Sequence, residues 1–408
     1  MTLAEHWLSI VGIGEDGWDG LSGEARRAVE SAELLYGGVR HLALVPDGVK
    51  PAASIAWPSP MAPAIEQILI EYRGKKRVTV LASGDPMLYG VGVSLTRNLA
   101  AVEFRVLPQA SAFSLACARL GWPVAETNLI TLVHRPAEHL LRHLYPGQRL
   151  ILFSEDGSTP ATVARLLTQS GYGASRLDVF ESLGGSSERH IGALAASWPG
   201  EPCGDLNLIA VRCAPDSETR PLSLAPGLPD DAFETDGQLT KREVRAATLA
   251  RLAPLPGQML WDVGAGTGTI GIEWMRVHPS CSCIAFEARE ERAERIRANA
   301  RRLGVPTLRV IQGMAPAVFA ELQSPDTIFI GGGLGDAGLF EACWERLSPG
   351  GRLVANAVTI ESEAGLALRH TLYGGDLVRL MVSRADQING TYVWRPMMPI
   401  TQWTVTKR

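Results

Sequence analysis

The chain has 408 residues, 46% of them hydrophobic and 20% charged, which is enough for two or three domains that each bury a full core. Its formal net charge of -4 and its pI of about 6.1 argue against a protein that binds many nucleic-acid phosphates. No run approaches the ~20 apolar residues of a membrane span, and the N-terminus lacks a signal-peptide pattern, so we expect a cytoplasmic protein with no membrane or nucleic-acid partner.

A glycine-rich loop follows the first apolar run. Residues 10–20 read IVGIGEDGWDG, and Gly12, Gly14 and Gly17 match the G-x-G-x-x-G spacing of dinucleotide-binding folds. In those folds a helix begins inside the loop and an acidic residue ends the second strand, where it binds a ribose. Here the first good helix N-cap is Ser22, and the second apolar run, LLYGG, ends in glycines. We therefore interpret the loop as a tight turn that brings backbone close to a ligand.

Strand-like runs alternate with helical ones through the first half of the chain. The pattern predicts strands at 76–83, 129–134, 148–154 and 205–212, and helices at 111–121 and 159–171. A stretch rich in proline, acidic and small residues then predicts a linker. The predicted organisation is a domain at 1–213, a linker at 214–234 and a domain at 235–408.

The second half alternates in the same way. We predict strands at 257–264, 282–288, 325–333, 350–358, 377–387 and 400–407, with helices that start near Thr269 and at 289–304. Alternation of this kind predicts α/β domains whose helices pack on a largely parallel sheet, twice over. The two halves do not repeat each other in sequence.

The six cysteines form no C-x-x-C pair. Cys281 and Cys283 alternate on a strand-like run and share one face of it, so we interpret them as small buried hydrophobic residues. We expect no metal site.

A second glycine motif has the features of a nucleoside-binding site. WDVGAGTGTIG places Gly264, Gly266 and Gly268 between the end of an apolar strand and the start of a helix. Glu287 ends the next strand, where a carboxylate can accept both hydroxyls of a ribose. S-adenosylmethionine has a ribose and no pyrophosphate, and it fits this pair of features. We expect Asp262 to orient amides of the loop or to meet the ammonium group of the cofactor.

The motifs of the second half resemble a known family. TDGQLTKREVRA, WDVGAGTGTIGIEW, EARE, IFIGGG and GGRLVANAVTIE are similar to the class I methyltransferase domain of cobalamin biosynthesis that methylates carbon 15 of a precorrin and removes a carboxylate. The resemblance spans about 235–400 and implies a Rossmann-like domain. It places the cofactor contacts on Thr240, Gly264, Ala265, Gly266, Thr267, Gly268, Glu287 and Ala315. This chain has Met314 where the family often has an aspartate.

The substrate end of this domain differs from that of enzymes that methylate bases. Those enzymes carry a D/N-P-P-Y type segment after the fourth strand, and this chain has three glycines there, centred on Gly332. The glycines leave space for a broad, flat substrate, although a simple turn at the end of a strand explains them equally well. The candidates to bind peripheral carboxylates are Lys241, Arg242, Arg245 and Arg384. Each of them alone also fits an ordinary surface residue.

The first half resembles the tetrapyrrole methylase family over about 7–212. VTVLASGDPMLYG and PQASAFSLACARLGWP carry the resemblance, which implies two lobes that hold S-adenosylmethionine in a cleft by backbone contacts. The positions that match cofactor contacts are Gly84, Asp85, Leu88, Ser111 and Ala112, and Gly14 joins them from the first loop. Asp85 fits a structural turn cap equally well. Glu15 and Asp16 stand where the family usually has a proline.

Two segments of the first half resemble substrate-side segments of the same family. TLVHRP contains His134 and Arg135, our candidates for catalytic residues, and SSERHIG contains Arg189 and His190. A lone histidine is more often a structural hydrogen-bonding residue than a general acid or base. Both readings of His134 stay open.

The order of the two domains resembles that of the precorrin-6Y methyltransferase family. The resemblance implies a bifunctional enzyme of corrin ring synthesis that methylates carbons 5 and 15, decarboxylates the ring C acetate and releases precorrin-8X. It implies one S-adenosylmethionine per domain, a tetrapyrrole substrate and a homo-oligomer. Because the methyl group is already activated and the ring carbon is electron-rich, we expect catalysis by alignment and desolvation rather than by acid–base groups.

Two alternatives remain at this stage. The chain is an RNA or protein methyltransferase with an N-terminal recognition module, or its N-terminal half is a docking domain that binds tetrapyrrole without catalysis. The acidic pI and the absence of a base-stacking motif weigh against the first alternative, and the intact G-D-P and Ser111 loops weigh against the second. Whether the substrate contains cobalt, which carbon reacts first and whether intermediates pass directly between sites stay open.

Overall fold

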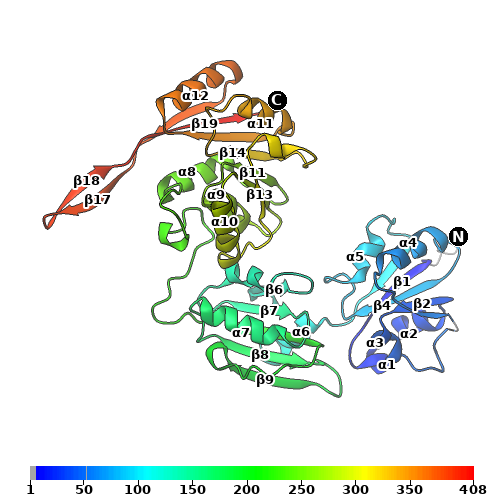
Figure 1. The fold of residues 1–408 in the computed structure, drawn as a ribbon. Helices are drawn as coiled ribbons and strands as arrows, with labels where there is room; N and C mark the ends of the chain where they lie inside the picture. The colour runs from blue at the N-terminus through cyan, green and yellow to red at the C-terminus, as the bar shows by residue number, and fades with distance from the viewer. Residues whose placement is uncertain (1–5, 52) are drawn as a thin grey trace. The chain divides into compact units, whose positions relative to one another are not determined.

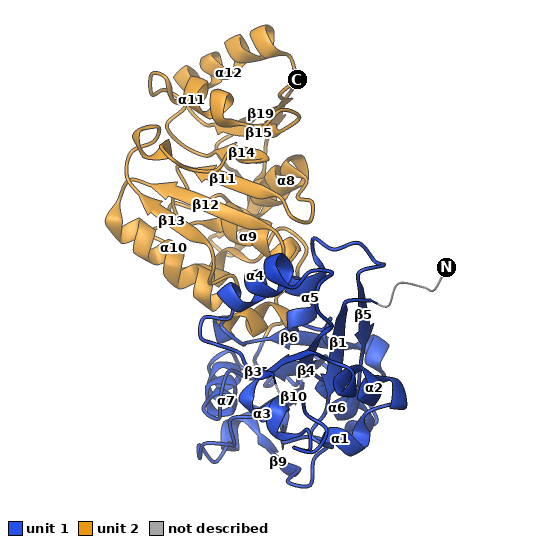
Figure 2. Cartoon of the chain, turned by 90° about the vertical axis from the view of Figure 1, so that its right-hand side faces the viewer, with its two compact units in different colours: residues 1–137, 145–219 blue, residues 138–144, 220–408 orange. Residues whose placement is uncertain are grey.

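The computed structural model describes residues 6–51 and 53–408, which form two compact units (Figure 2). Unit 1 contains the described residues up to 137 together with 145–219, and unit 2 contains 138–144 and 220–408. Within the described part of the chain, no helix is long and apolar enough to cross a bilayer.

Unit 1 begins with a lobe built on a five-stranded parallel sheet (Figure 1). The strand order is β3-β2-β4-β1-β5. Its elements are β1 (Leu8–Ile13), α1 (Gly17–Gly20), α2 (Gly23–Glu30), β2 (Leu34–Gly37), α3 (Val39–Ala43), β3 (Ser54–Ala56), α4 (Ala62–Glu71), β4 (Val78–Ser83), α5 (Val91–Thr96) and β5 (Phe104–Leu107). The helix that follows, α6 (Ala112–Leu120), packs on the sheet of the next lobe.

Strand β1 shows why this sheet needs helices on both faces. All six of its residues are buried, and neighbours along it pack in different clusters, Ile10 with Ile68 and Val11 with Val29. Side chains alternate across a strand, so a continuous apolar run must be covered on both sides. The prediction of a largely parallel sheet is confirmed for this lobe. Ser22 caps α2 as predicted, because its Oγ accepts a hydrogen bond from the Ala25 amide at 3.2 Å.

The second lobe of unit 1 corrects the same prediction. Only β6 and β7 run parallel, and the other pairs in its order, β6-β7-β10-β8-β9, are antiparallel. The strand predicted at 129–134 ends earlier, at Thr131, and His134 lies in a turn with a φ of 53°. The lobe contains β6 (Thr127–Thr131), β7 (Arg149–Phe153), α7 (Thr159–Gln169), β8 (Arg176–Glu181), β9 (Arg189–Leu194) and β10 (Asn207–Arg212).

Unit 2 contains a seven-stranded sheet in the order β13-β12-β11-β14-β15-β19-β16. The first five are parallel, and β19 lies antiparallel between β15 and β16. The elements are α8 (Arg242–Leu252), β11 (Met259–Val263), α9 (Thr269–Val277), β12 (Ser282–Glu287), α10 (Glu290–Arg302), β13 (Arg309–Gln312), β14 (Thr327–Ile330), α11 (Leu339–Arg346), β15 (Arg352–Ala357), α12 (Ile360–Tyr373), β16 (Asp376–Leu380), β17 (Ser383–Ile388), β18 (Thr391–Pro396) and β19 (Ile400–Thr406).

Helices cover both faces of this sheet. Leu260 packs in one cluster with residues of α8, α9 and α10, whereas its neighbour Trp261 packs in another with residues of α11 and α12. Cys281 and Cys283 are buried in the first cluster, which confirms their interpretation as core residues. The predicted fold class, α/β with a two-lobed first domain and a Rossmann-like second domain, is confirmed.

Two parts of unit 2 differ from the prediction. The strand predicted at 377–387 is divided into β16 and β17. Within the described residues β17 pairs only with β18, in a hairpin that projects from the unit (Figure 1). The end of the predicted linker is also packed, because Leu228 and Phe233 are buried in the core of unit 2. Pro- and acid-rich composition indicates a loop, but it does not show whether the loop is bound to the fold.

Candidate active sites

The loop between β11 and α9 has the backbone that its glycines allow. Gly264, Gly266 and Gly268 have φ angles of 72°, 60° and 78°, a region that residues with a side chain rarely adopt. The helix starts at Thr269, as predicted, and Gly268 is its N-cap. Gly264 also lies against Gly332, since a Cβ on Gly264 would stand 3.0 Å from the Gly332 nitrogen. The two glycine motifs therefore meet at the carboxyl end of the sheet.

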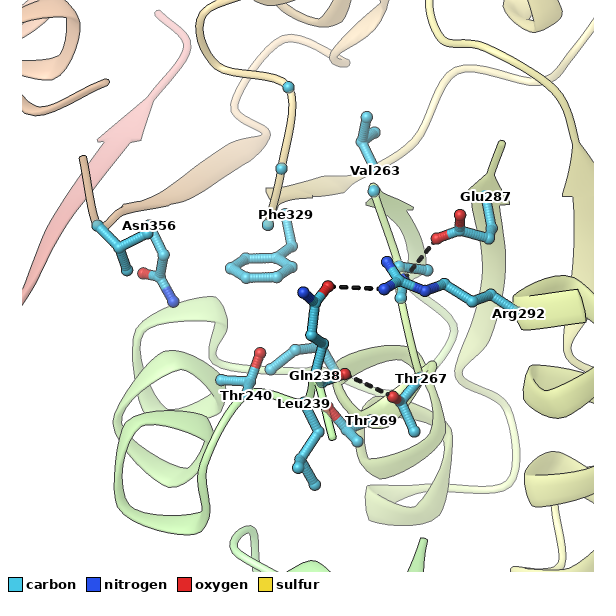
Figure 3. A pocket seen from close by; sticks show the side chains of 18 of the residues that line it. Gln238, Leu239, Thr240, Val263, Thr267, Thr269, Glu287, Arg292, Phe329 and Asn356 are labelled. Carbon is cyan, nitrogen blue, oxygen red and sulfur yellow. Dashed lines mark hydrogen bonds between the residues drawn. The ribbon is translucent and has the colours of Figure 1, made fainter. Parts of the chain in front are cut away.

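A cavity of about 740 Å³ opens over this loop. Figure 3 shows Glu287 and Asn356 on opposite sides of it, with Phe329 and Gln238 between them. The predicted site residues that line it are Thr240, Lys241, Gly264, Ala265, Gly266, Thr267, Glu287, Ala315 and Gly332. Gly268 is the one predicted loop residue outside the lining, because it is turned into the core beside Ile296.

Glu287 stands at the end of β12 as predicted, and it is almost fully buried. Its Oε2 accepts a hydrogen bond from the Gly266 amide at 2.9 Å, and its Oε1 accepts one from the Arg289 amide at 3.0 Å. Each carboxylate oxygen has a second lone pair that can accept a hydroxyl. The carboxylate is thus fixed at the wall of the cavity and can still bind a diol.

Residues 234–241, which we call the strap, cross the cavity from the linker to α8. Thr267 donates its hydroxyl to the Gln238 carbonyl oxygen at 2.8 Å, and Arg292 donates to the Gln238 side-chain oxygen at 2.6 Å (Figure 3). Asn299 donates to the first carbonyl of the strap at 3.0 Å. The strap is therefore fastened to the glycine loop and to α10, and it forms one wall of the cavity.

Arg245 corrects a prediction, because it does not face a substrate. Its side chain is fully buried, and its Nε donates to Glu273 at 2.5 Å while Nη1 donates to the Thr240 carbonyl at 2.6 Å. Glu273 also accepts the amides of Gly227 and Leu228. A buried charge needs an ion pair and hydrogen bonds of this kind to be tolerated. Arg245 fastens the strap to α9 instead of binding a carboxylate of the ligand.

The other predicted substrate residues divide into two groups. Lys241 and Gly332 line the cavity, whereas Arg242 and Arg384 do not. Arg384 lies on β17, and its guanidinium donates to Glu243 at 2.6 Å. Met314 also lines the cavity, with an exposed side chain, in place of the family's aspartate.

Asp262 is buried at the end of β11 and lies outside the cavity lining. Its Oδ2 accepts a hydrogen bond from the Gly271 amide at 3.0 Å, and its Oδ1 has no partner among the described residues. The predicted hydrogen bonds with loop amides are wrong, since the carboxyl holds the first turn of α9, and the expected contact with the cofactor stays a prediction. Burial raises the pKa of Asp262 from its usual 3.8 to about 7.

We expect the Asp262→Asn variant to gain stability relative to the wild type as the pH rises. The native chain keeps a proton on Asp262 that the unfolded chain loses, so this carboxyl costs stability progressively between pH 3.8 and about 7 and by a constant amount above. Asparagine can accept the same Gly271 bond without carrying a charge. Calorimetry between about pH 5 and about pH 8 should show the difference grow by about 1–3 kcal/mol.

Asp326→Asn is the matched control for this experiment. Asp326 is half-buried and accepts the Met259 amide at 2.8 Å, at the opposite end of the same strand. If the free energy of unfolding changes with pH in the same way for the wild type and for Asp262→Asn, burial of Asp262 does not govern the pH dependence of stability.

In unit 1 the predicted cofactor loops meet at the carboxyl ends of β1, β4 and β5. The Gly84 amide donates to the Ile13 carbonyl at 3.1 Å, and the Gln109 amide donates to the Gly84 carbonyl at 3.0 Å. A Cβ on Gly12 would overlap the Gly84 oxygen and stand 2.7 Å from the Gln109 nitrogen. The opening glycine motif is therefore explained by backbone packing, with Gly14 just beyond the contact.

Two side chains in these loops have structural roles. Ser111 caps α6, as predicted, and its Oγ accepts the Ser114 amide at 3.1 Å. Asp85 caps a turn, because its Oδ1 accepts the Met87 amide at 2.9 Å. Ala112 begins α6 and Leu88 lies half-buried in the loop after β4, so both stay near the backbone that the family resemblance assigns to the cofactor.

The predicted catalytic residues lie in the turn after β6. The guanidinium of Arg135 stands 5.8 Å from the centre of the Tyr89 ring, which contacts Phe153 edge-on, so Arg135 is brought to the loop after β4. His134 is exposed and pairs with Glu155 at 2.9 Å. Arg189 and His190 pair with carboxylates of β8, Glu181 and Asp178, which gives them structural partners.

The sequence analysis missed a polar cluster beside the unit 1 loops. Arg40 pairs with Glu15 and donates to the Ser83 hydroxyl at 2.9 Å, and the His41 Nε2 lies 2.9 Å from the same hydroxyl. Burial lowers the pKa of His41 to about 4, and the Arg40 charge adds to this effect. Glu15 replaces the family's proline, and that departure was the only signal for this cluster in the sequence.

Comparison with known proteins covers both units. Residues 8–196 match the family model of the tetrapyrrole (corrin/porphyrin) methylases, and residues 231–407 match that of the precorrin methyltransferase domain.

Individual relatives extend over nearly the whole chain. A precorrin-6Y C(5,15)-methyltransferase [decarboxylating] from Sinorhizobium sp is 47% identical over 99% of this chain and 97% of its own. One of the same name from Mycobacterium tuberculosis is 44% identical over 98% of this chain and 100% of its own. A crystal structure of the C-terminal domain of precorrin-6Y C5,15-methyltransferase from Rhodobacter capsulatus is 42% identical, covers 46% of this chain and all of its own, and has a TM-score of 0.44.

Proposed function

The chain belongs to the family of decarboxylating precorrin-6Y C(5,15)-methyltransferases, and from this premise we propose that each of its two domains binds its own S-adenosylmethionine and methylates one bridging carbon. The reaction as a whole is a methylation of a precorrin with loss of a carboxylate, in cobalamin biosynthesis. In our proposal residues 1–213 methylate carbon 5, and residues 235–408 methylate carbon 15 and remove the ring C acetate carboxylate to give precorrin-8X.

The observation that carries the proposal for the second domain is the cavity between the glycine loop and Glu287. A Cβ on Gly266 would meet nothing within 4 Å, so the loop backbone is open to a ligand, and the Glu287 carboxylate stands where a ribose diol needs acceptors. A volume of about 740 Å³ lies within the usual range for a small-molecule site and leaves space beside the cofactor for part of a substrate. When bound, S-adenosylmethionine supplies an electrophilic methyl group on a sulfonium.

The lining residues support catalysis by alignment. Among residues 6–51 and 53–408, those that line the cavity include no histidine, cysteine, serine or tyrosine, and their titratable members are Lys241, Glu287, Arg292 and Asp336. Arg292 is bound to the strap and Glu287 accepts two backbone amides, so both have binding roles, and Asp336 is exposed. The cavity walls would hold the reacting carbon against the methyl group and keep water out. Lys241 would bind a peripheral carboxylate of the substrate.

For the first domain we propose that the loops around Gly14, Gly84 and Ser111 hold the cofactor by their backbone. Arg135 would contact the substrate from the second lobe, and Arg40 would do so from the first, where Glu15 and Ser83 already orient its guanidinium. Guanidinium groups held in this way suit the acetate and propionate groups of a tetrapyrrole. His134 is exposed and pairs with Glu155, so our proposal gives it no proton-transfer role.

Binding of S-adenosylhomocysteine tests the number of sites directly. We expect isothermal titration calorimetry to give two molecules per chain, whereas a first domain that only docks the tetrapyrrole predicts one. Glu287→Gln should weaken one of the two sites about tenfold to a hundredfold, because it replaces a charged acceptor and sets an amide group against a backbone N–H.

Glu291→Gln provides the matched control, since Glu291 lies exposed at the start of α10 outside the cavity lining. It should bind two molecules with the affinities of the wild type. A single site in the wild type would reject the proposal of one cofactor per domain. If the affinities of both sites are unchanged in Glu287→Gln, this carboxylate is not the ribose acceptor.

The remaining expectations stay predictions. The family resemblance predicts a homo-oligomer, and the projecting β17–β18 hairpin exposes Tyr392 and Trp394, which suits a contact between copies. A cytoplasmic location and the absence of a nucleic-acid partner also remain predictions from the sequence.

A further inference from the structure

The cavity of unit 2 has an apolar wall that faces away from the glycine loop. It consists of Val358, Leu380, Val382, Met397, Met398 and Ile400, from the segment after β15 and from β16, β19 and their connections. No charged side chain belongs to this wall. Among the described residues that line the cavity, the cations are Lys241 and Arg292, which come from the start of α8 and from α10.

The cations nearest in sequence to the wall are neutralised by the protein itself. Arg379 donates to both carboxylate oxygens of Glu363, at 2.6 and 2.5 Å. Arg384 is paired with Glu243 and Asp230. The wall therefore contains apolar side chains alone, and the neighbouring arginines, Arg379 and Arg384, are already paired with carboxylates of the protein.

One polar side chain, Asn356, borders this end of the cavity. Its Nδ2 donates to the Thr248 hydroxyl at 3.1 Å, and its Oδ1 accepts from the Gln402 amide at 2.9 Å. Gln402 donates to Thr248 as well, and Thr248 donates to the Val244 carbonyl. These bonds fix which end of the Asn356 amide is the donor and leave it a second N–H. The site offers a neutral donor here, and no charge.

We propose that the ring C acetate of the substrate lies against this wall, and that the wall drives decarboxylation by withholding solvent and cations from the carboxylate. The inference rests on the proposed function of the second domain. The bond between the acetate methylene and its carboxylate carbon breaks, and its electron pair enters the conjugated macrocycle. Carbon dioxide leaves, and the methylene carbon then takes a proton from water to become a methyl group. The step needs no oxidant or reductant.

The physical reason is a difference between the carboxylate and the transition state. A carboxylate concentrates its charge and loses hydration when it is placed against aliphatic and thioether groups. In the transition state the charge spreads into the macrocycle and needs less hydration, so an apolar surrounding lowers the barrier. A cation at the wall would act in the opposite sense, because it would stabilise the carboxylate before the bond breaks.

Introduced lysines test this assignment. Leu380→Lys and Val382→Lys place a cation in the wall, Val382→Met adds similar length without charge, and Met381→Lys places the same cation on an exposed neighbour outside the cavity lining. The full chain, in excess over a precorrin labelled at the acetate carboxyl, is followed for release of labelled carbon dioxide in a single turnover. Methyl incorporation at carbons 5 and 15 from labelled cofactor is measured in parallel.

We expect at least one wall lysine to slow release of carbon dioxide by about tenfold to a hundredfold, and Val382→Lys to slow it more than Val382→Met does, while Met381→Lys stays within about threefold of the wild type. The assignment is overturned if both wall lysines release carbon dioxide at the wild-type rate, or if Val382→Met slows it as much as Val382→Lys. Retention of the calorimetric transition of unit 2 in every variant reports that this unit is folded. A wild type that releases no carbon dioxide and labels no carbon 15 would instead reject the proposed function.

Discussion

Gly264→Ala should abolish methylation of carbon 15 and leave methylation of carbon 5 intact. Gly264 has a φ of 72°, which is strained for alanine, and the new Cβ would stand 3.0 and 3.1 Å from the Gly332 nitrogen and Cα. The strain and the contact both fall on backbone that faces the cavity. Small displacements of reacting groups have large effects on rate, so we expect a loss of about a hundredfold or more in the carbon 15 reaction.

Gly257→Ala controls for backbone strain alone. Gly257 has a φ of 86° in the turn before β11, and a Cβ there would meet nothing within 4 Å. It should lose a similar amount of stability and keep both activities. NMR of products made with labelled cofactor distinguishes the two carbons. Carbon 15 methylation by Gly264→Ala within about threefold of the wild type would contradict the role given to this loop.

Gly12→Ala should give the reciprocal result, with loss of carbon 5 methylation and retention of carbon 15 methylation. Its Cβ would overlap the Gly84 carbonyl oxygen and press on the Gln109 amide, so the loops after β4 and β5 must both shift. These are the loops that we assign to the cofactor of the first domain. We expect that reaction to fall by about a hundredfold or more, measured as label at carbon 5.

Gly48→Ala is the control in the same lobe, because a Cβ on Gly48 would meet nothing within 4 Å. A Gly12→Ala chain that fails to fold its first domain would show the loss of one calorimetric transition, so the rate should be read together with the melting curve. Loss of both methylations while both transitions persist would contradict the independence of the two sites.

The sequence predicted the features that depend on neighbours along the chain. Ser111 at a helix N-cap, the start of α9 at Thr269 and the place of Glu287 at the end of β12 each follow from a local pattern, and each is found in the structure. Such positions are set by backbone conformation and strand length, which a window of residues reveals.

Features that depend on distant partners were not predictable in this way. From the sequence Arg245 is expected to be a surface residue, because its partner Glu273 lies 28 positions away and no sequence pattern predicts the pair. Asn356 acquires its orientation from Gln402, on a strand that returns only at the end of the chain. The antiparallel second lobe of unit 1 was missed for the same reason, since strand direction depends on pairing rather than on apolar content.

The end of the predicted linker, residues 227–233, also decides where this polypeptide can be divided. Leu228 and Phe233 fill the core of unit 2, and the amides of Gly227 and Leu228 are bound to the same buried glutamate as Arg245. A C-terminal fragment that begins at 235, the domain boundary predicted from composition, would lack Gly227, Leu228 and Phe233. Glu273 would then lose two backbone donors, and the core would contain a cavity beside α9. Excision upstream of 220 keeps these partners, so the second domain is longer than its sequence motifs suggest.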